Sequence, residues 1–189
     1  MSLESLIRER RTVRKFNNLP VSEALVKSLL QKSEQLCPHD GESQWRYVYV
    51  GTDEARERLS GYISEKVLES RIARLTLSKV IESYQRRFLK IPAYLIAIAD
   101  TDHDPIKNEE IYGTICRILQ NFQLLSWEQQ LGMAWITEPI IQNELFYKRI
   151  GLKEGERFVG MLEIGYFDKS PKARARTTAD RYWTDSVYQ

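Results

Sequence analysis

One stretch of the sequence reads PAYLIAIAD, from Pro92 to Asp100. It is a nearly continuous run of apolar residues, and the polar turn that begins at Asp100 ends it. A strand exposed on one face alternates apolar and polar residues, whereas a strand covered on both faces is apolar throughout. The run therefore predicts a central strand in a sheet that carries helices on both faces.

The sequence on either side of this strand alternates between helical and extended patterns. Apolar residues recur at helical spacing from Glu109 to Leu131, and Gly132 stands where a helix C-terminus prefers glycine. Aromatic and β-branched residues predict further strands at 45–50, 133–137 and 157–166. Together these segments predict an α+β fold in which helices flank a central sheet.

Further helices are predicted in the remaining segments. Residues 3–7 have helical spacing, and a second helix begins near Ser22 and ends before Cys37. From 54 to 90, apolar residues about one turn apart predict one long charged helical region. A helix that Pro139 opens and Gly151 closes completes the set of predicted helices.

Length and charge limit the classes of protein to consider. The chain has 189 residues without an internal repeat or a Gly/Ser linker, so we expect one domain spanning 1–189. Its 28 basic and 26 acidic residues give a net charge of +2, too small for a strong long-range field toward nucleic acid or an acidic membrane. The charged N-terminus and the two unpaired cysteines predict a soluble cytoplasmic protein.

Several kinds of catalytic site lack their necessary residues. The two histidines, His39 and His103, do not lie at ligand spacing from a cysteine, so we expect no metal site. Three aspartates between 100 and 104 imitate a calcium loop, but Pro105 stands where that loop needs glycine. The glycine-rich motifs of α/β-hydrolases, P-loop enzymes and Rossmann dehydrogenases are also missing.

The remaining signal is a set of arginines in loops near the two ends of the chain. A guanidinium group binds phosphate oxygens in a bidentate manner, and a neighbouring hydroxyl adds a donor. A basic loop by itself is more often solvated surface, so the assignment needs further support. The residues concerned are Arg10, Arg11, Thr12 and Arg14 near the start, and Arg174 and Arg176 near the end.

That support is a resemblance to the FMN-dependent nitroreductase family. Residues 10–16 resemble its N-terminal signature, Arg-Arg-Ser-x-Arg-x-Phe, with Thr12 in place of serine. Pro38, Gln44 and Trp45 resemble its Pro-Ser-x-x-Asn-x-Gln-Pro-Trp loop, although the proline before the tryptophan is absent. Both matches precede the first predicted strand.

The resemblance continues through the rest of the chain in the same order. The run from 92 to 100 resembles the family's apolar strand, and residues 120–135 resemble its core helix and the Leu-Gly-Leu-Gly-x-x-Trp segment that follows. Arg174 and Arg176 are similar to the basic residues after the family's last strand. Each motif is weak alone, but nearly the whole sequence takes part.

The resemblance implies a fold and an activity. It implies a three-layer fold with a mostly antiparallel central sheet, and a homodimer that binds FMN at the subunit interface. NADH or NADPH would reduce the flavin at N5, and a nitroaromatic, quinone or related acceptor would then reoxidise it in a ping-pong cycle. The cofactor would carry the chemistry, so no catalytic acid or base is expected from the protein.

The resemblance also implies roles for individual residues. The phosphate and ribityl chain of FMN would be bound by residues from both ends of the chain, Arg10, Thr12, Arg174 and Arg176, and Arg11 is a further cofactor-binding candidate. Arg14 would lie near N1 and O2, where a fixed cation favours the negative charge that reduction develops. Backbone groups of Ile136 and Thr137 would approach N5, and the partner subunit would contribute Pro38, His39 and Gln44.

Two alternatives stay open at this point. A flavoprotein of the same fold could instead serve in flavin storage, dehalogenation or flavin destruction. A protein of another class could use the basic ends to bind nucleic acid through its phosphates without catalysis. The near-neutral net charge and the lack of a nucleic-acid-binding motif argue against the second alternative.

Overall fold

The computed structural model describes the chain except for residues 1, 40, 42–44, 70–77, 137 and 174–189. Within the described residues one sheet has four strands in the order β1-β2-β4-β3, and each neighbouring pair is antiparallel. These strands are β1 (Trp45–Val50), β2 (Ala93–Asp100), β3 (Leu131–Ile136) and β4 (Glu156–Tyr166). Because β1 and β3 lie at the edges, the long strand β4 and the apolar strand β2 occupy the centre.

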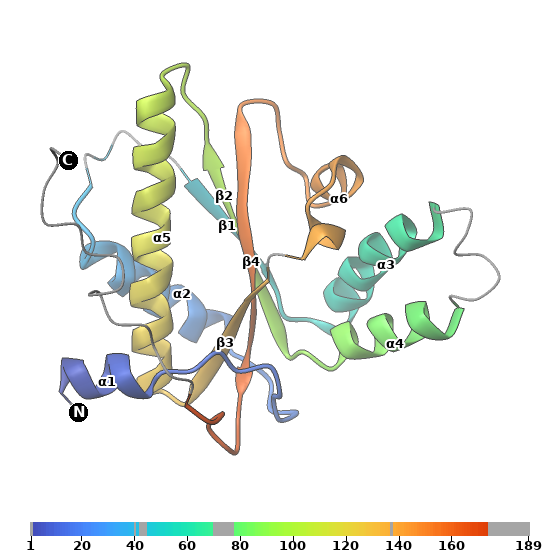
Figure 1. Cartoon of the computed structure of the whole chain (residues 1–189), viewed down its shortest axis with the longest axis horizontal. Helices are drawn as coiled ribbons and strands as arrows, with labels where there is room; N and C mark the ends of the chain where they lie inside the picture. Colours follow the sequence, from blue (N-terminus) through green and yellow to red (C-terminus); the bar gives the residue numbers. More distant parts are fainter. Residues whose placement is uncertain (1, 40, 42–44, 70–77, 137, 174–189) are drawn as a thin grey trace, which may run out of the picture.

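Helices cover the two faces of this sheet and make three layers (Figure 1). One face carries α2 (Glu23–Gln35) and α5 (Pro105–Glu128), and α1 (Leu3–Glu9) lies against α5. The other face carries α3 (Asp53–Glu69), α4 (Ser78–Leu89), the 3₁₀ turn η2 (Pro139–Ile141) and α6 (Glu144–Arg149). The predicted α+β class and three-layer arrangement are confirmed.

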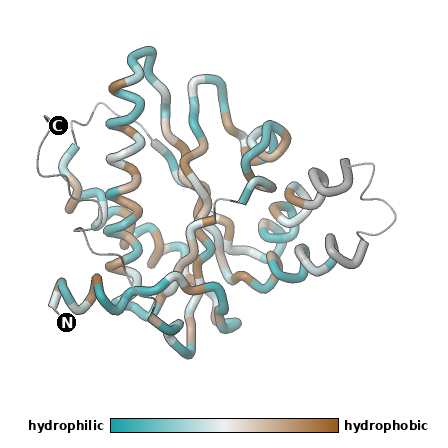
Figure 2. Tube along the Cα trace, viewed as in Figure 1, coloured by the Kyte–Doolittle hydropathy of each residue, from teal (hydrophilic) through white to brown (hydrophobic). Residues whose placement is uncertain are grey.

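The strand β2 contributes to a hydrophobic core on each face of the sheet. Leu95 and Ala97 pack in the cluster under α2 and α5, whereas Tyr94, Ile96 and Ile98 pack in the cluster under α3, α4 and α6. Each residue from 93 to 99 is at most 2% exposed, so the predicted central strand is confirmed. Figure 2 shows hydrophobic stretches of the chain in the sheet and in the helices packed against it.

The region from 54 to 90, which was predicted to be helical with its extent left open, is helical in the part that the structure describes. The chain forms two helices, α3 and α4, which pack side by side (Figure 1). A continuous helix of that length would extend about 55 Å and carry its far apolar residues beyond the sheet. Two shorter helices instead bury Leu59 and Ile63 of α3 together with Phe88 of α4 in one cluster. Periodicity alone cannot distinguish these arrangements, because both preserve the helical spacing.

The predicted role of Gly132 as a helix C-terminus is wrong. The helix α5 ends at Glu128, and Gln130 takes the left-handed conformation with a φ of 57°. Gly132 lies inside β3, opposite Gly165 of β4. At its other end α5 begins at Pro105, where the Asp104 side chain accepts a hydrogen bond of 2.9 Å from the backbone N–H of Ile106. Thus the aspartate-rich turn caps a helix.

The helix predicted between Pro139 and Gly151 is shorter than expected. Pro139 opens only the 3₁₀ turn η2, and the α-helix α6 begins at Glu144. Asn143 caps α6, because its side-chain oxygen accepts a 3.0 Å hydrogen bond from the N–H of Phe146. Gly151 does follow the helix with a φ of 73°, as a helix-ending glycine should.

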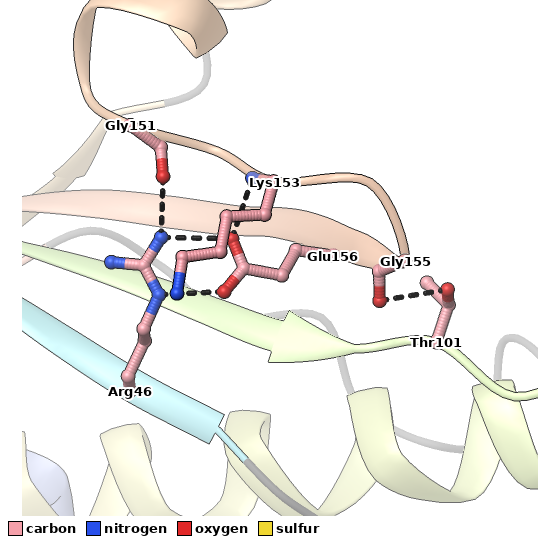
Figure 3. A network of polar contacts seen from close by, with 6 residues as sticks. All are labelled: Arg46, Thr101, Gly151, Lys153, Gly155 and Glu156. Carbon is pink, nitrogen blue, oxygen red and sulfur yellow. Dashed lines mark hydrogen bonds and ion pairs between the residues drawn. The ribbon is translucent and has the colours of Figure 1, made fainter.

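An ion-pair network at the start of β4 joins strands that are not neighbours (Figure 3). Arg46 of β1 donates to both carboxylate oxygens of Glu156, at 2.7 and 2.8 Å, and to the carbonyl of Gly151 at 2.7 Å. The backbone N–H of Lys153 donates to the same carboxylate at 2.7 Å. The hydrogen bond from Arg46 lowers the pKa of Glu156 to about 2. This carboxylate is therefore fully partnered.

Two further properties concern the described ranges only. None of the helices in these ranges is long and apolar enough to cross a membrane. They also contain no group of three or more His, Cys, Asp or Glu residues that could hold a metal ion.

Candidate functional site

The basic segment from 10 to 16, hereafter the front loop, is held against the edge of the sheet by its backbone. The N–H of Val13 donates to the carbonyl of Met133 in β3 at 2.9 Å, and Thr12 forms a parallel bridge with Met133. Just beyond the loop, the N–H of Asn17 donates to the carbonyl of Tyr166 at 2.8 Å. The loop therefore follows β3 and the end of β4.

Two glycines in the sheet make room for the front loop. A Cβ atom on Gly132 would lie 2.5 Å from Val13, and one on Gly165 would lie 2.8 Å from the ring of Phe16. Real Cβ atoms do not approach other atoms so closely, so both positions need glycine for this packing. The inward packing of Val13, which is 1% exposed, fixes the loop while Thr12 and Arg14 stay exposed.

The front loop and the segment 169–173 after β4 line a common cleft of about 810 Å³. Nearby, the side-chain amide of Asn17 donates to the carboxylate of Asp168 at 3.1 Å, which connects the two segments. Lys169 and Lys172 add two cations on the far side of the cleft, and none of the described residues that line it is acidic. Two segments from opposite ends of the sequence thus enclose a positively charged space.

Four of the predicted site residues line this cleft, namely Arg10, Arg11, Thr12 and Arg14. One terminal nitrogen of Arg11 also donates to the carbonyls of Arg8 and Arg10, at the C-terminus of α1. Part of the hydrogen-bonding capacity of Arg11 therefore serves to end that helix. The predicted residues Gln44, Thr137, Arg174 and Arg176 lie outside the described residues.

Pro38 and His39 do not join this cleft within one chain. Pro38 lines a different groove, between the end of α2 and the middle of α5, and both cysteines line it too. The His39 ring packs edge-on against Trp45 with centroids 5.0 Å apart. Their assignment to a partner's site stays a prediction.

The predicted site residue Ile136 ends β3 opposite Met161 and is 4% exposed.

A second ion-pair network, which the sequence analysis missed, adjoins the front loop. Arg87 of α4 lies 3.2 Å from a carboxylate oxygen of Glu163 in β4 and 3.5 Å from one of Glu138, just after β3. Arg87 and Arg14 line the same pocket. The network therefore connects α4 to the two strands that support the front loop.

The carboxylate of Glu163 lies in an environment that disfavours its negative charge. Its residue is 1% exposed, and its Oε2 atom has no hydrogen-bond partner in the described part of the chain. Burial raises the pKa of Glu163, and the nearby Arg87 offsets that rise only partly. A lone acidic residue in the apolar stretch from 159 to 164 was the sequence signal for this site. Its partner on α4 was not visible in the sequence.

The comparison with protein families agrees with this geometry. The model of the Nitroreductase family matches residues 7–166, which include the front loop and all strands of the described sheet. The chain belongs to the nitroreductase family. The second network lies within the matched region. The basic cleft lies partly within it and partly in the segment 169–173 directly after it.

Individual relatives cover nearly the whole chain. The nitroreductase-family chain is 26% identical over 175 residues to a Bacillus subtilis protein named "Putative NAD(P)H nitroreductase YfhC", covering 93% of this chain and 89% of that protein. A nitroreductase-like family protein from Bacillus cereus has a solved structure with a TM-score of 0.86 and 32% identity, covering 99% of this chain and 97% of that one.

A more distant structure shares the fold alone. The FMN and NADPH-dependent nitroreductase NfnB from a Sphingopyxis strain has a TM-score of 0.77 at 16% identity, with both chains covered completely. The fold of this nitroreductase-family chain is thus found both in a relative of moderate identity and in one whose sequence has diverged far.

Proposed function

We propose that this chain is a single-domain, FMN-dependent oxidoreductase that uses NAD(P)H to reduce nitroaromatic, quinone or related acceptors. The observation that carries the proposal is the cationic cleft between the front loop and the segment after β4. Membership of the nitroreductase family supports the same activity, as do the names of relatives described as NAD(P)H or FMN and NADPH-dependent nitroreductases. A cytoplasmic homodimer is part of the proposal.

The cleft fits the phosphate end of FMN. Arg10 and Thr12 offer a guanidinium group and a hydroxyl from one side, and Lys169 and Lys172 offer ammonium groups from the other. Charge-assisted hydrogen bonds of this kind are roughly twice as strong as neutral ones. Arg174 and Arg176 would follow directly along the same segment, and Arg11 would contribute mainly charge. The whole chain is nearly neutral, so this attraction is local.

The front loop also suits the flavin ring. From Thr12 to Arg14 an extended chain spans about 7 Å, so the loop reaches from the phosphate toward the ring. Arg14 would stabilise the negative charge that develops at N1 and O2, and the backbone after Ile136 would approach N5. A bound FMN would supply the chemistry of hydride transfer between NAD(P)H and the acceptor. The protein supplies position and charge.

The proposal is tested on the purified protein by flavin content and turnover. We expect a yellow protein that releases about one FMN per chain on heating, and steady-state oxidation of NAD(P)H with a nitroaromatic or quinone acceptor in ping-pong kinetics. A protein that binds FMN tightly but never oxidises NAD(P)H would instead favour storage, dehalogenation or flavin destruction. Salt-dependent binding of nucleic acid without any flavin would contradict the proposal entirely.

The role of Arg14 has its own test. Replacing this cation, Arg14→Ala, should lower the reduction potential of the bound flavin, because the reduced form loses electrostatic stabilisation. The potential is measured by titration against a redox dye. Lys27→Ala, which removes an exposed cation from α2, is the matched control and should leave the potential unchanged. An unchanged potential in the Arg14 variant would rule out this role.

A further inference from the structure

A second cationic pocket lies on the other side of Arg14. It has a volume of about 700 Å³ and is enclosed by the front loop and α4. Among the eight described residues that line it, five are basic and none is acidic: Arg14, Lys15, Arg86, Arg87 and Lys90, beside Phe16, Ser83 and Ile91. The pocket is therefore strongly basic, although the chain as a whole has a net charge of only +2.

The residues from α4 form a stripe on one side of that helix. Ser83, Arg86 and Arg87 of α4 lie three or four positions apart on one side of the helix, and Lys90 follows directly after the helix ends at Leu89. From Ser83 to Leu89 the helix rises about 9 Å. The stripe is therefore long enough to meet more than one phosphate group.

Most of this charge is not neutralised within the described part of the chain. Arg87 is held by Glu138 and Glu163, and Arg86 has only a distant pairing with Glu82, at 3.8 Å on the exposed helix surface. In the described residues Arg14, Lys15 and Lys90 have no carboxylate within ion-pair distance. Like charges brought together without counterions favour binding of a multiply charged anion.

We propose that this pocket, hereafter the α4 pocket, binds the phosphate groups of the hydride donor and makes the protein prefer NADPH over NADH. The inference rests on the proposed function. The FMN phosphate has its own cleft, and Arg14 marks the ring end of the flavin, next to the α4 pocket. A donor whose nicotinamide lies on the ring must place its phosphates on neighbouring surface.

The extra phosphate of NADPH distinguishes it from NADH and carries nearly two negative charges. Lys15, Arg86 and Lys90 are the side chains of the α4 pocket that neither the flavin assignment nor the Glu163 network uses. The partly exposed ring of Phe16 supplies an apolar flank beside them, which suits the base or ribose of a nucleotide. The pocket thus combines charge for the 2′-phosphate with a surface for its nucleoside.

Binding is tested first without turnover, by calorimetry on the FMN-loaded protein. Adenosine 2′,5′-bisphosphate should bind at least tenfold more tightly than 5′-AMP, which lacks the 2′-phosphate, and added salt should weaken the binding. The double variant Arg86→Ala/Lys90→Ala should lose this difference, whereas Lys27→Ala should keep it. Equal affinity for the two nucleotides in the wild type would overturn the proposal.

Kinetics give the second readout. The ratio of kcat/KM for NADPH to that for NADH should exceed about tenfold in the wild type and fall at least tenfold in the double variant. Inorganic pyrophosphate provides a third arm, because binding as tight as that of the bisphosphate would indicate an unspecific anion site and overturn the donor assignment. Failure of the proposed function looks different, since the protein would then carry no FMN or oxidise neither donor.

Discussion

The strand β4 carries an acidic residue near each of its ends, and the two behave in opposite ways. At the start, Glu156 accepts two hydrogen bonds from Arg46 and one from a backbone N–H, and its pKa falls to about 2. Near the other end, Glu163 is nearly inaccessible, keeps one oxygen without a described partner, and has a raised pKa. The same residue type therefore meets two different environments within one strand.

The different environments of Glu156 and Glu163 distinguish an ion pair that only supports the fold from one that lies beside a candidate binding site. The Arg46 pair joins β1 to β4 across β2, and both carboxylate oxygens of Glu156 accept hydrogen bonds (Figure 3). The Arg87 pair holds a charge in place beside the α4 pocket, at a cost in desolvation that a purely structural contact would avoid. An incompletely partnered buried charge is thus the better indicator of function.

The largest expected effect comes from removing the cation of the buried network. Arg87→Met should lower the free energy of unfolding by about 2 kcal/mol at pH 7, because Glu163 is then left buried without its counterion. Arg46→Met should cost only about 1 kcal/mol, since Glu156 is less deeply buried, at 8% exposed against 1% for Glu163, and keeps the N–H of Lys153 as a donor. Urea unfolding of both variants measures the two losses. A larger loss for Arg46→Met would invert the comparison.

The second effect concerns acid. Glu156 has a lowered pKa in the folded chain, so it contributes stability above about pH 4.5, and this contribution disappears as the pH falls toward 2. Glu156→Gln should therefore be less stable than the wild type by about 1 kcal/mol at pH 6, with solvent screening at the partly exposed Arg46 limiting the value. The gap should close as the pH falls from about 4.5 toward 2. A gap that does not vary with pH would contradict the ion-pair assignment.

The smallest effect has the opposite sign. Because the folded chain holds the proton of Glu163 to a higher pH than the unfolded chain does, this residue contributes less stability as the pH rises through its raised pKa. Glu163→Gln should thus gain stability relative to the wild type, on the order of 0.5 kcal/mol, as the pH rises above about 4.5. Thermal unfolding at several pH values measures it. If the relative stability fell over this range, Glu163 would be an ordinary stabilising carboxylate.

Much of the layered fold was predictable from the sequence, because a strand that is buried on both faces of a sheet consists almost entirely of apolar residues. The apolar run at 92–100 identified the central strand, and the spacing from 109 to 131 identified the long helix beside it. The packing of α3 against α4 was not predictable, since helical spacing is the same in both helices. How two amphipathic helices such as α3 and α4 pack depends on the area of sheet that they can cover, which helical spacing does not record.

The candidate site was predictable only in part. Arg10, Thr12 and Arg14 are adjacent in sequence and matched a known motif, and the structure places them in one cleft. Arg87 and Glu163 are 76 positions apart and meet only through the packing of α4 on the sheet. No local pattern records such a contact. The glycines that admit the front loop were visible, but the reason for them was tertiary.

The central claim is that the front loop and the segment after β4 together bind the phosphate of FMN. Titration of the flavin-free protein with FMN and with riboflavin, followed by flavin fluorescence, tests it most directly. The account predicts that FMN binds about 100-fold more tightly, as two charge-assisted hydrogen bonds to its phosphate would give, and that Arg10→Ala loses most of this preference. Equal affinity for FMN and riboflavin, or no uptake of FMN in excess, would contradict it.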